Sequence, residues 1–85
     1  MIKYFNQGSP GFKAIQFKDN AESFAEIRGW VGRRFYYDYQ ECPFVFLEKG
    51  STREGVRKDD WVIFDSLMGF NVYSPDDMKY AKEIE

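Results

Sequence analysis

Short apolar runs, each ended by turn-forming residues, follow one another along most of this chain. One stretch breaks the pattern: in residues 20–31 the apolar side chains recur at the spacing of an amphipathic helix. Residues 12–17 and 33–39 instead alternate between two faces, as strands do. The pattern predicts an α+β fold with antiparallel strands, and residues 1–85 are short enough to form a single domain.

The helix over about residues 20–31 has a clear beginning and end. Either Asp19 or Asn20 can cap it, because both side chains accept hydrogen bonds from the free N–H groups of a first turn. Gly32 follows the last apolar position and suits the left-handed conformation that often ends a helix.

A short helix is also predicted near the C-terminus, over about residues 75–83. Ser74 can cap it, and Pro75 suits its first position. Its buried edge would consist of the apolar residues at every third position, Met78, Ala81 and Ile84.

The other apolar runs predict strands. Residues 33–39 and 44–48 would form a hairpin or a bent ribbon, and residues 61–64 and 70–73 would form a second hairpin. Residues 61–64 are apolar on both faces, which favours a central strand. Residues 49–57 are polar and are predicted to be a long loop with some strand character near Thr52. Together these segments predict a small curved antiparallel sheet or half-barrel with the first helix packed on it.

The composition limits the compartment and the partners. The formal net charge is −2, whereas domains that bind duplex DNA are usually basic, so no duplex DNA is expected as a partner. Cys42 is the only cysteine, so no internal disulfide can form. No apolar run approaches the ~20 residues of a membrane helix, and no signal peptide is visible. We therefore expect a cytoplasmic protein without a membrane partner.

Few residues are suited to catalysis. The chain has no histidine, which is the commonest general base and a common metal ligand. Cys42 consequently has no imidazole to activate it, and its aromatic surroundings predict a small buried thiol. The carboxylate pairs at residues 59–60 and 76–77 are interpreted as parts of a turn and a helix start. The sequence predicts no enzymatic activity, no catalytic residue, no cofactor and no metal.

One segment has the character of a binding site. Residues 33–39 combine arginines, which hold phosphates, with tyrosines, which stack on bases or fill protein interfaces. A further set of basic residues would extend this surface if the polar segment that follows folds toward it: Arg28, Lys49, Arg53, Arg57 and Lys58. The candidate binding residues are Arg33, Arg34, Tyr36, Tyr37, Tyr39, Arg53 and Arg57. The same alternation also fits an ordinary half-buried strand, so both interpretations stay open.

Two segments carry a family resemblance. The first contains Ala14-Ile15-Gln16-Phe17, Asp19-Asn20, a helix and Trp30-Val31-Gly32. The second contains Asp60-Trp61-Val62-Ile63, Gly69-Phe70 and Pro75-Asp76, with Met78 and Tyr80. In both, the chain resembles a family of short, mostly uncharacterised proteins of tailed phages and prophages. Members carry an A-[VI]-Q-[FW] strand before a helix and a P-G-D-W-[VI]-I turn and strand near the end.

The resemblance covers the first and last parts of the chain, and residues 33–57 have no counterpart. It implies a viral protein that acts inside a bacterium, and it supplies no catalytic residues. The family's Pro-Gly turn is replaced by Lys58-Asp59. Asp59 is therefore expected to take the left-handed conformation that glycine takes easily.

The leading hypothesis is a non-catalytic phage protein that inhibits or sequesters a host component, as a counter-defence inhibitor. A first alternative is a sponge for a small cyclic nucleotide signal, in which case a homo-oligomer is expected. The nucleotide would be held by Arg33, Arg34 and Tyr36, together with Arg53 or Arg57. A second alternative is a minor structural or assembly protein of a virion. The expected partner is accordingly a host protein or a small nucleotide.

Overall fold

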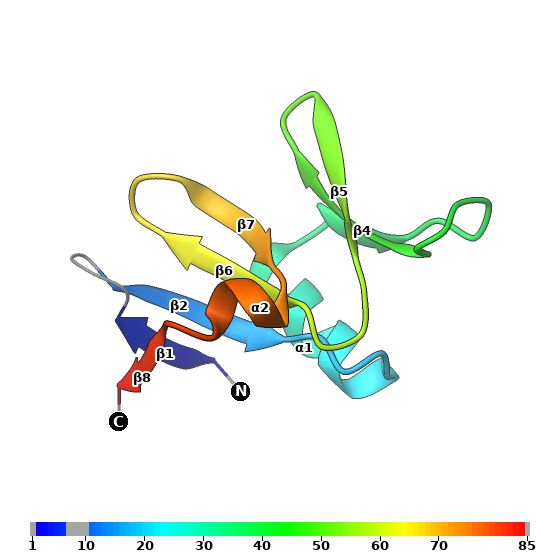
Figure 1. Cartoon of the computed structure of the whole chain (residues 1–85). Helices are drawn as coiled ribbons and strands as arrows, with labels where there is room; N and C mark the ends of the chain where they lie inside the picture. The colour runs from blue at the N-terminus through cyan, green and yellow to red at the C-terminus, as the bar shows by residue number, and fades with distance from the viewer. Residues whose placement is uncertain (1, 7–10, 85) are drawn as a thin grey trace.

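The computed structural model describes residues 2–6 and 11–84, which form eight strands and two helices (Figure 1). The strand pairs are antiparallel, and the strands divide between a five-stranded and a three-stranded sheet. The predicted α+β class is therefore confirmed, with two small sheets in place of one continuous surface.

The larger sheet has the strand order β7-β6-β2-β1-β8. Its strands are β1 (Lys3–Asn6), β2 (Phe12–Gln16), β6 (Trp61–Asp65), β7 (Gly69–Tyr73) and β8 (Lys82–Ile84). The predicted second hairpin is confirmed, since β6 pairs with β7 from Trp61 opposite Tyr73 to Asp65 opposite Gly69. β6 lies between β7 and β2, which explains why its sequence is apolar on both faces.

The smaller sheet has the order β3-β4-β5, with bounds β3 (Phe35–Tyr37), β4 (Val45–Lys49) and β5 (Thr52–Val56). β3 and β4 form the predicted first hairpin. The prediction of a long loop over residues 49–57 is wrong, because β5 pairs with β4 along its whole length, but the strand character expected near Thr52 is confirmed. Gly50 supplies the left-handed conformation of the turn between them, with φ 64°. As an edge strand, β5 can remain polar while Val56 enters the core.

Helix α1 (Ala21–Val31) forms where the apolar spacing predicted it. Asn20, not Asp19, is the cap: its Oδ1 accepts a hydrogen bond from the N–H of Ser23 at 2.8 Å. Asp19 has φ 56° and turns the chain from β2 into the helix. Gly32 ends the helix with φ 94°, a positive φ that glycine adopts easily, but its ψ of −152° differs from the left-handed helical conformation that was expected.

Helix α2 (Pro75–Met78) is shorter than predicted. Ser74 and Asp77 form a reciprocal cap, with N–H to oxygen distances of 2.9 and 3.1 Å. The predicted helix over residues 75–83 is wrong beyond Met78, because Lys82–Ile84 pairs with the free edge of β1 as strand β8. That pairing satisfies backbone groups of both segments, which a further helical turn would not do. No helix within residues 2–6 and 11–84 is long and apolar enough to cross a membrane.

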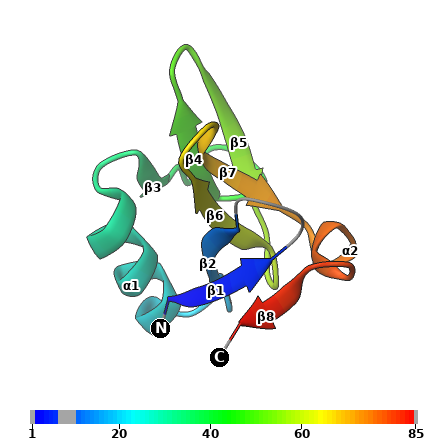
Figure 2. The same ribbon diagram turned by 90° about the vertical axis from the view of Figure 1, so that its left-hand side faces the viewer.

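The core consists of two clusters, one on each face of the larger sheet. β2 contributes to both because its side chains alternate: Ile15 enters one cluster and Ala14 enters the other. The first cluster also joins α1 and the smaller sheet, through Ile27, Phe35, Val45, Leu47 and Val56. The second cluster lies against α2, which is on the opposite side from α1 (Figure 2). The smaller sheet therefore extends the first cluster away from the larger sheet.

Candidate functional site

The predicted site residues do not share one surface, because β3 directs successive side chains to opposite faces of the smaller sheet. Tyr36 lies opposite Phe46 of β4, and Tyr37 lies opposite Val45. We call the face that carries Tyr36 and Arg53 the polar face. We call the face that carries Tyr37, and that continues the first core cluster, the core face.

On the polar face, Arg53 is held by several neighbours. Its Nη1 donates to Oδ2 of Asp38 at 2.9 Å and to the hydroxyl of Tyr36 at 3.3 Å. Its Nη2 lies 3.6 Å from Oε1 of Glu41, and the guanidinium lies over the ring of Phe46, 3.9 Å from the centroid. The hydrogen bond from Arg53 lowers the pKa of Asp38, and the bonds to Tyr36 and Asp38 raise the pKa of Arg53. Arg53 is thus engaged within the chain and is a poor candidate for holding a phosphate.

The core face ends in an open groove of about 340 Å³ at the margin of the core. Its floor consists of the buried residues Phe17, Val45 and Val56. Above them stand three aromatic rings of the β3–β4 connection and its flanks, Tyr37, Tyr39 and Phe44. We call this feature the aromatic groove. In this groove, buried core residues border a hollow that is open to solvent.

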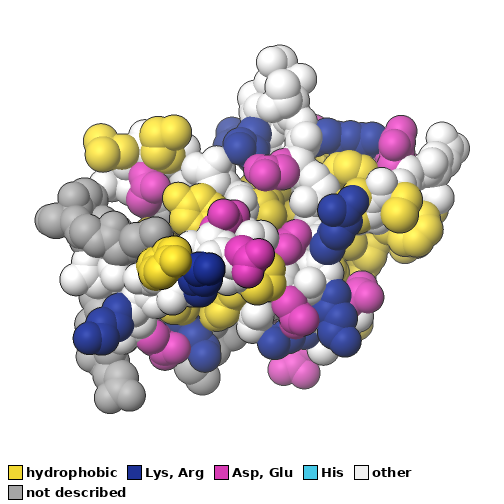
Figure 3. All heavy atoms as spheres, viewed as in Figure 1, with side chains coloured by type: hydrophobic (Ala, Val, Ile, Leu, Met, Phe, Trp, Pro, Cys, Tyr) yellow, Lys and Arg dark blue, Asp and Glu magenta, His cyan; other side chains and the backbone are white. Residues whose placement is uncertain are grey.

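The aromatic residues of the groove form a row of neighbouring rings. Ring centroids lie 4.2 Å apart for Phe24 and Tyr37, 5.5 Å for Tyr37 and Tyr39, and 6.4 Å for Tyr39 and Phe44. The exposed fraction is 37% for Tyr37, 77% for Tyr39 and 52% for Phe44. In Figure 3, hydrophobic and basic side chains gather at the right-hand end, where Figure 1 places the β3–β4 connection. Adjacent exposed aromatics of this kind are typical of interaction surfaces.

The basic residues of the groove are Arg57 and Lys58, on the β5–β6 connection. This connection is fixed to the end of β2, where the N–H of Asp59 donates to the carbonyl of Phe17 at 2.7 Å. Asp59 has φ 73°, so the left-handed conformation predicted for it is confirmed. Within the described part of the chain, the side chains of Arg57 and Lys58 have no ion-pair partner. Their charges are therefore available to a ligand.

Two residues in the lining of the groove, Tyr37 and Cys42, carry side chains that bear on its chemistry. Burial raises the pKa of the Tyr37 phenol, and Tyr39 and Asp19 raise it further, so Tyr37 stays protonated. The prediction that Cys42 is buried is wrong: its thiol is exposed in the lining of the groove. The β3–β4 connection carries Cys42 outward before Val45 returns to the core.

The polar face holds the β3–β4 connection in place for the groove. The N–H of Asp38 donates to the carbonyl of Phe44 at 2.6 Å, which closes the connection. Arg53 binds Asp38 and Glu41 from the polar face. Gly55 leaves room for Pro43, because a Cβ at position 55 would overlap the proline ring. The connection that presents the exposed rings is therefore supported from beneath.

Arg33 and Arg34 lie elsewhere, in the turn between α1 and β3 and at the opposite end of β3 from Tyr39. The structure therefore divides the predicted site into three groups. The groove contains Tyr37, Tyr39 and Arg57; the polar face carries Tyr36 and Arg53; and the α1–β3 turn carries Arg33 and Arg34.

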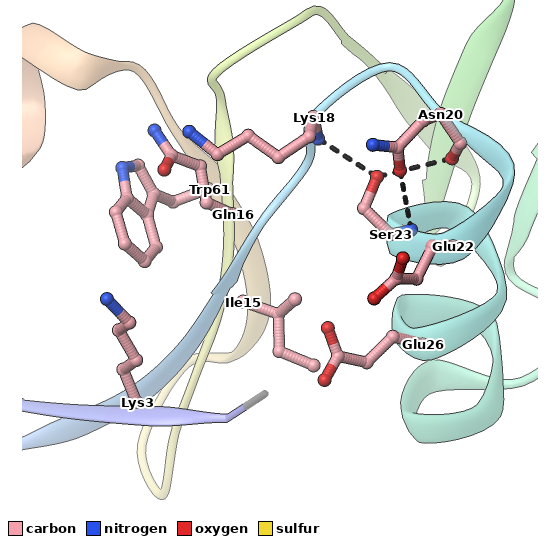
Figure 4. A pocket seen from close by; sticks show the side chains of 9 residues that line it. All are labelled: Lys3, Ile15, Gln16, Lys18, Asn20, Glu22, Ser23, Glu26 and Trp61. Atoms are coloured by element: carbon pink, nitrogen blue, oxygen red, sulfur yellow. Dashed lines mark hydrogen bonds between the residues drawn. The ribbon is translucent and has the colours of Figure 1, made fainter.

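A second hollow, of about 260 Å³, lies at the start of α1 (Figure 4). Several of its polar groups, although not the carboxylate of Glu22, are engaged within the described part of the chain. Lys3 and Lys18 pair with Glu83 and Asp59 at 3.6 and 3.5 Å. The Ser23 hydroxyl accepts a hydrogen bond from the N–H of Lys18 at 3.0 Å. We therefore regard the aromatic groove as the better candidate.

Residues 2–6 and 11–84 contain no group of three or more His, Cys, Asp or Glu side chains placed to hold a metal ion. Comparison with known proteins adds no assignment: no family model, no curated protein and no solved structure matches the chain. The resemblance to tailed-phage proteins therefore stays a prediction from sequence motifs.

The sequence interpretation missed several groove residues: Asp19, Cys42, Pro43 and Phe44. Phe44 belongs to an apolar run, and nothing in that run indicates that its side chain is exposed to solvent. Lys58 was among the basic residues expected to extend the binding surface, and it does line the groove beside Arg57.

Proposed function

We propose that this protein acts by contact, as a non-catalytic binding protein, and that the aromatic groove is its binding surface. The observation that carries this proposal is the exposure of Tyr39 and Phe44 directly beside buried core residues. Exposed rings forgo hydrophobic stabilisation that a partner can supply. Aromatic residues in such hollows are common anchors of protein interfaces.

We further propose that the partner is a host protein in the bacterial cytosol and that this chain is a phage-encoded inhibitor of the counter-defence type. The resemblance of the first and last parts of the chain to tailed-phage proteins supports this origin. The groove supports a protein partner, because its floor is apolar and its rings are arranged as a side-chain receptor.

A nucleotide sponge receives less support from the same residues. Arg53 is engaged with Asp38, and the α1–β3 turn that carries Arg34 lies away from the groove. Calorimetry with a cyclic dinucleotide tests this alternative, and we expect no heat of binding. Micromolar binding that is lost in Arg34→Ala would establish the sponge in place of the inhibitor.

Affinity capture from the cytosol of the host bacterium tests the leading proposal. The double variant Tyr39→Ser/Phe44→Ser alters the groove. The matched control Tyr80→Ser/Tyr4→Ser removes rings of nearly equal exposure, 76% and 52%, at other places on the surface. We expect the wild type and the control to capture one host protein and to inhibit its purified form, and the groove variant to do neither.

Equal capture by the groove variant would refute the groove as the binding surface. Recovery of the chain in purified virions, without capture of a host protein, would favour the structural alternative. Turnover of a substrate, lost on changing a single carboxylate, would refute the non-catalytic assignment.

A further inference from the structure

The aromatic groove also carries information about the chemistry of its partner, an inference that rests on the proposed function. The groove volume of about 340 Å³ lies at the lower end of the range of about 300–1,000 Å³ seen for small-molecule pockets. Such a space suits one bulky side chain with the adjoining backbone of a partner segment.

Tyr37, in the middle of the ring row, is better suited to contact with an apolar side chain than to stacking on a nucleic-acid base. A base stacks on a ring whose face is free. The planes of Tyr37 and Tyr39 are only 13° apart, so each ring already covers one face of the other. Phe24 lies on Tyr37 in the same way, at an angle of 22°. Tyr37, which has a near-parallel ring on each side, therefore presents its edge to the groove, whereas the exposed Tyr39 keeps one face against which an aliphatic or aromatic side chain can pack.

The charges beside the groove determine which residues of the partner segment can lie next to the side chain that enters the groove. Arg57 and Lys58 line the groove together with a single carboxylate, Asp19. The groove is thus lined by more positive than negative charge, whereas the whole chain has a net charge of −2. Nearby acidic groups are already engaged: Asp59 pairs with Lys18, and Asp60 accepts a hydrogen bond from the N–H of Arg57 at 2.9 Å.

We propose that the groove binds an acidic segment of the partner protein, in which one bulky apolar side chain enters between the rings and neighbouring carboxylates pair with Arg57 and Lys58. The ring row supplies most of the affinity, because its contacts are apolar and become fully covered. The basic pair supplies selectivity for acidic segments and speeds association, as rim charges generally do. A segment with basic residues in the same places is rejected by like charge.

An mRNA-displayed library of random linear peptides, selected on the immobilised protein, tests this inference without knowledge of the natural partner. We expect enriched peptides to share a large apolar residue with Asp or Glu close by. Their affinity should fall about tenfold or more in Tyr39→Ser/Phe44→Ser and stay within about twofold in Tyr80→Ser/Tyr4→Ser. Added salt should weaken their binding.

The decisive part of this experiment reverses the charges of the two basic residues in the groove. A second selection on Arg57→Glu/Lys58→Glu should enrich peptides with Lys or Arg in place of the acidic residues. The matched reversal Lys79→Glu/Lys82→Glu, on the segment after α2, should leave the acidic preference unchanged. Groove-dependent peptides that lack acidic residues, or a reversed variant that still selects acidic ones, would overturn this inference and leave the proposed function standing. If no enriched peptide depends on Tyr39 and Phe44, the proposed binding surface is refuted as well.

Discussion

The two faces of the small β3-β4-β5 sheet differ in how many of their charged and aromatic side chains have partners within the chain. On the polar face, Arg53 has carboxylate partners in Asp38 and Glu41, a hydroxyl in Tyr36 and an aromatic ring beneath it. On the core face, the aromatic groove leaves Tyr39 and Phe44 exposed and Arg57 and Lys58 without ion-pair partners among the described residues. Both faces are rich in aromatic and charged residues, so residue type alone does not distinguish a support from a binding surface. The difference lies in which groups remain unsatisfied.

The largest effect is expected on stability, in a comparison of substitutions at the buried end and at the exposed end of the core face. Phe35 is fully buried, whereas Tyr39, about four residues further along the chain and on the same face, is mostly exposed. Phe35→Ala should lower the free energy of unfolding by about 3–5 kcal/mol, because it leaves a cavity. Tyr39→Ala should change it by no more than about 0.5 kcal/mol. Urea denaturation measures both, and a large loss in Tyr39→Ala would show that the groove is part of the core.

The next largest effect is expected on binding affinity, in a comparison of one substitution on each face of the small sheet. Tyr39→Ser should weaken the affinity for the captured host protein by about 2 kcal/mol or more, which is roughly 30-fold, because the ring is an anchor. Tyr36→Phe, on the polar face, removes only a hydroxyl that contacts Arg53 and should change the affinity little. Calorimetry with the purified partner measures both. If the two variants lose equal affinity, the two faces do not differ in function.

The sequence predicted the elements better than it predicted their exposure. The α1 cap, the Ser74 cap and both hairpins followed from local patterns, because these features depend on residues close together in the chain. The end of α2 did not follow from a local pattern, because Lys82–Ile84 pairs with β1, which comes from the other end of the chain. β5 was missed because its polar residues pair at a sheet edge, where apolar alternation is not needed.

The candidate site was predicted only in part for the same reason. Alternation along β3 correctly placed Tyr36 and Tyr37 on opposite faces. It could not show that Arg53, from β5, would be neutralised by Asp38, or that Phe44 would remain outside the core. These outcomes depend on contacts between strands, which a single strand's pattern does not contain.

A smaller effect tests whether the support beneath the groove matters for binding. Gly55→Ala introduces a methyl group where the ring of Pro43 lies, so the β3–β4 connection must shift. We expect a stability cost of about 1–3 kcal/mol from overpacking, together with weaker binding of the partner. Gly29→Ala is the control, since a Cβ at position 29 meets open space. Unchanged binding in a folded Gly55→Ala protein would show that Pro43 does not position the groove.

The smallest effect concerns the ion pair on the polar face. Arg53 lowers the pKa of Asp38, so this pair stabilises the fold when pH is above the ordinary Asp pKa of about 3.9. The contribution is lost as pH falls through the lowered pKa of Asp38. Arg53→Ala should therefore have a lower Tm than wild type at neutral pH, and the gap should narrow in acid. Both groups are accessible to solvent, so the shift in Tm should be modest. A gap that is constant from neutral pH to pH 2 would contradict this role.

The most direct test of the aromatic groove uses Cys42, the only cysteine in the chain, as a reporter inside it. The rate of its alkylation by N-ethylmaleimide is measured with and without a saturating amount of the captured partner, in wild type and in Tyr80→Ser/Tyr4→Ser. We predict that the partner slows alkylation by about tenfold or more in both proteins, because it covers the groove and the thiol with it. Alkylation at an unchanged rate in the fully formed complex would contradict the assignment of the aromatic groove as the binding surface.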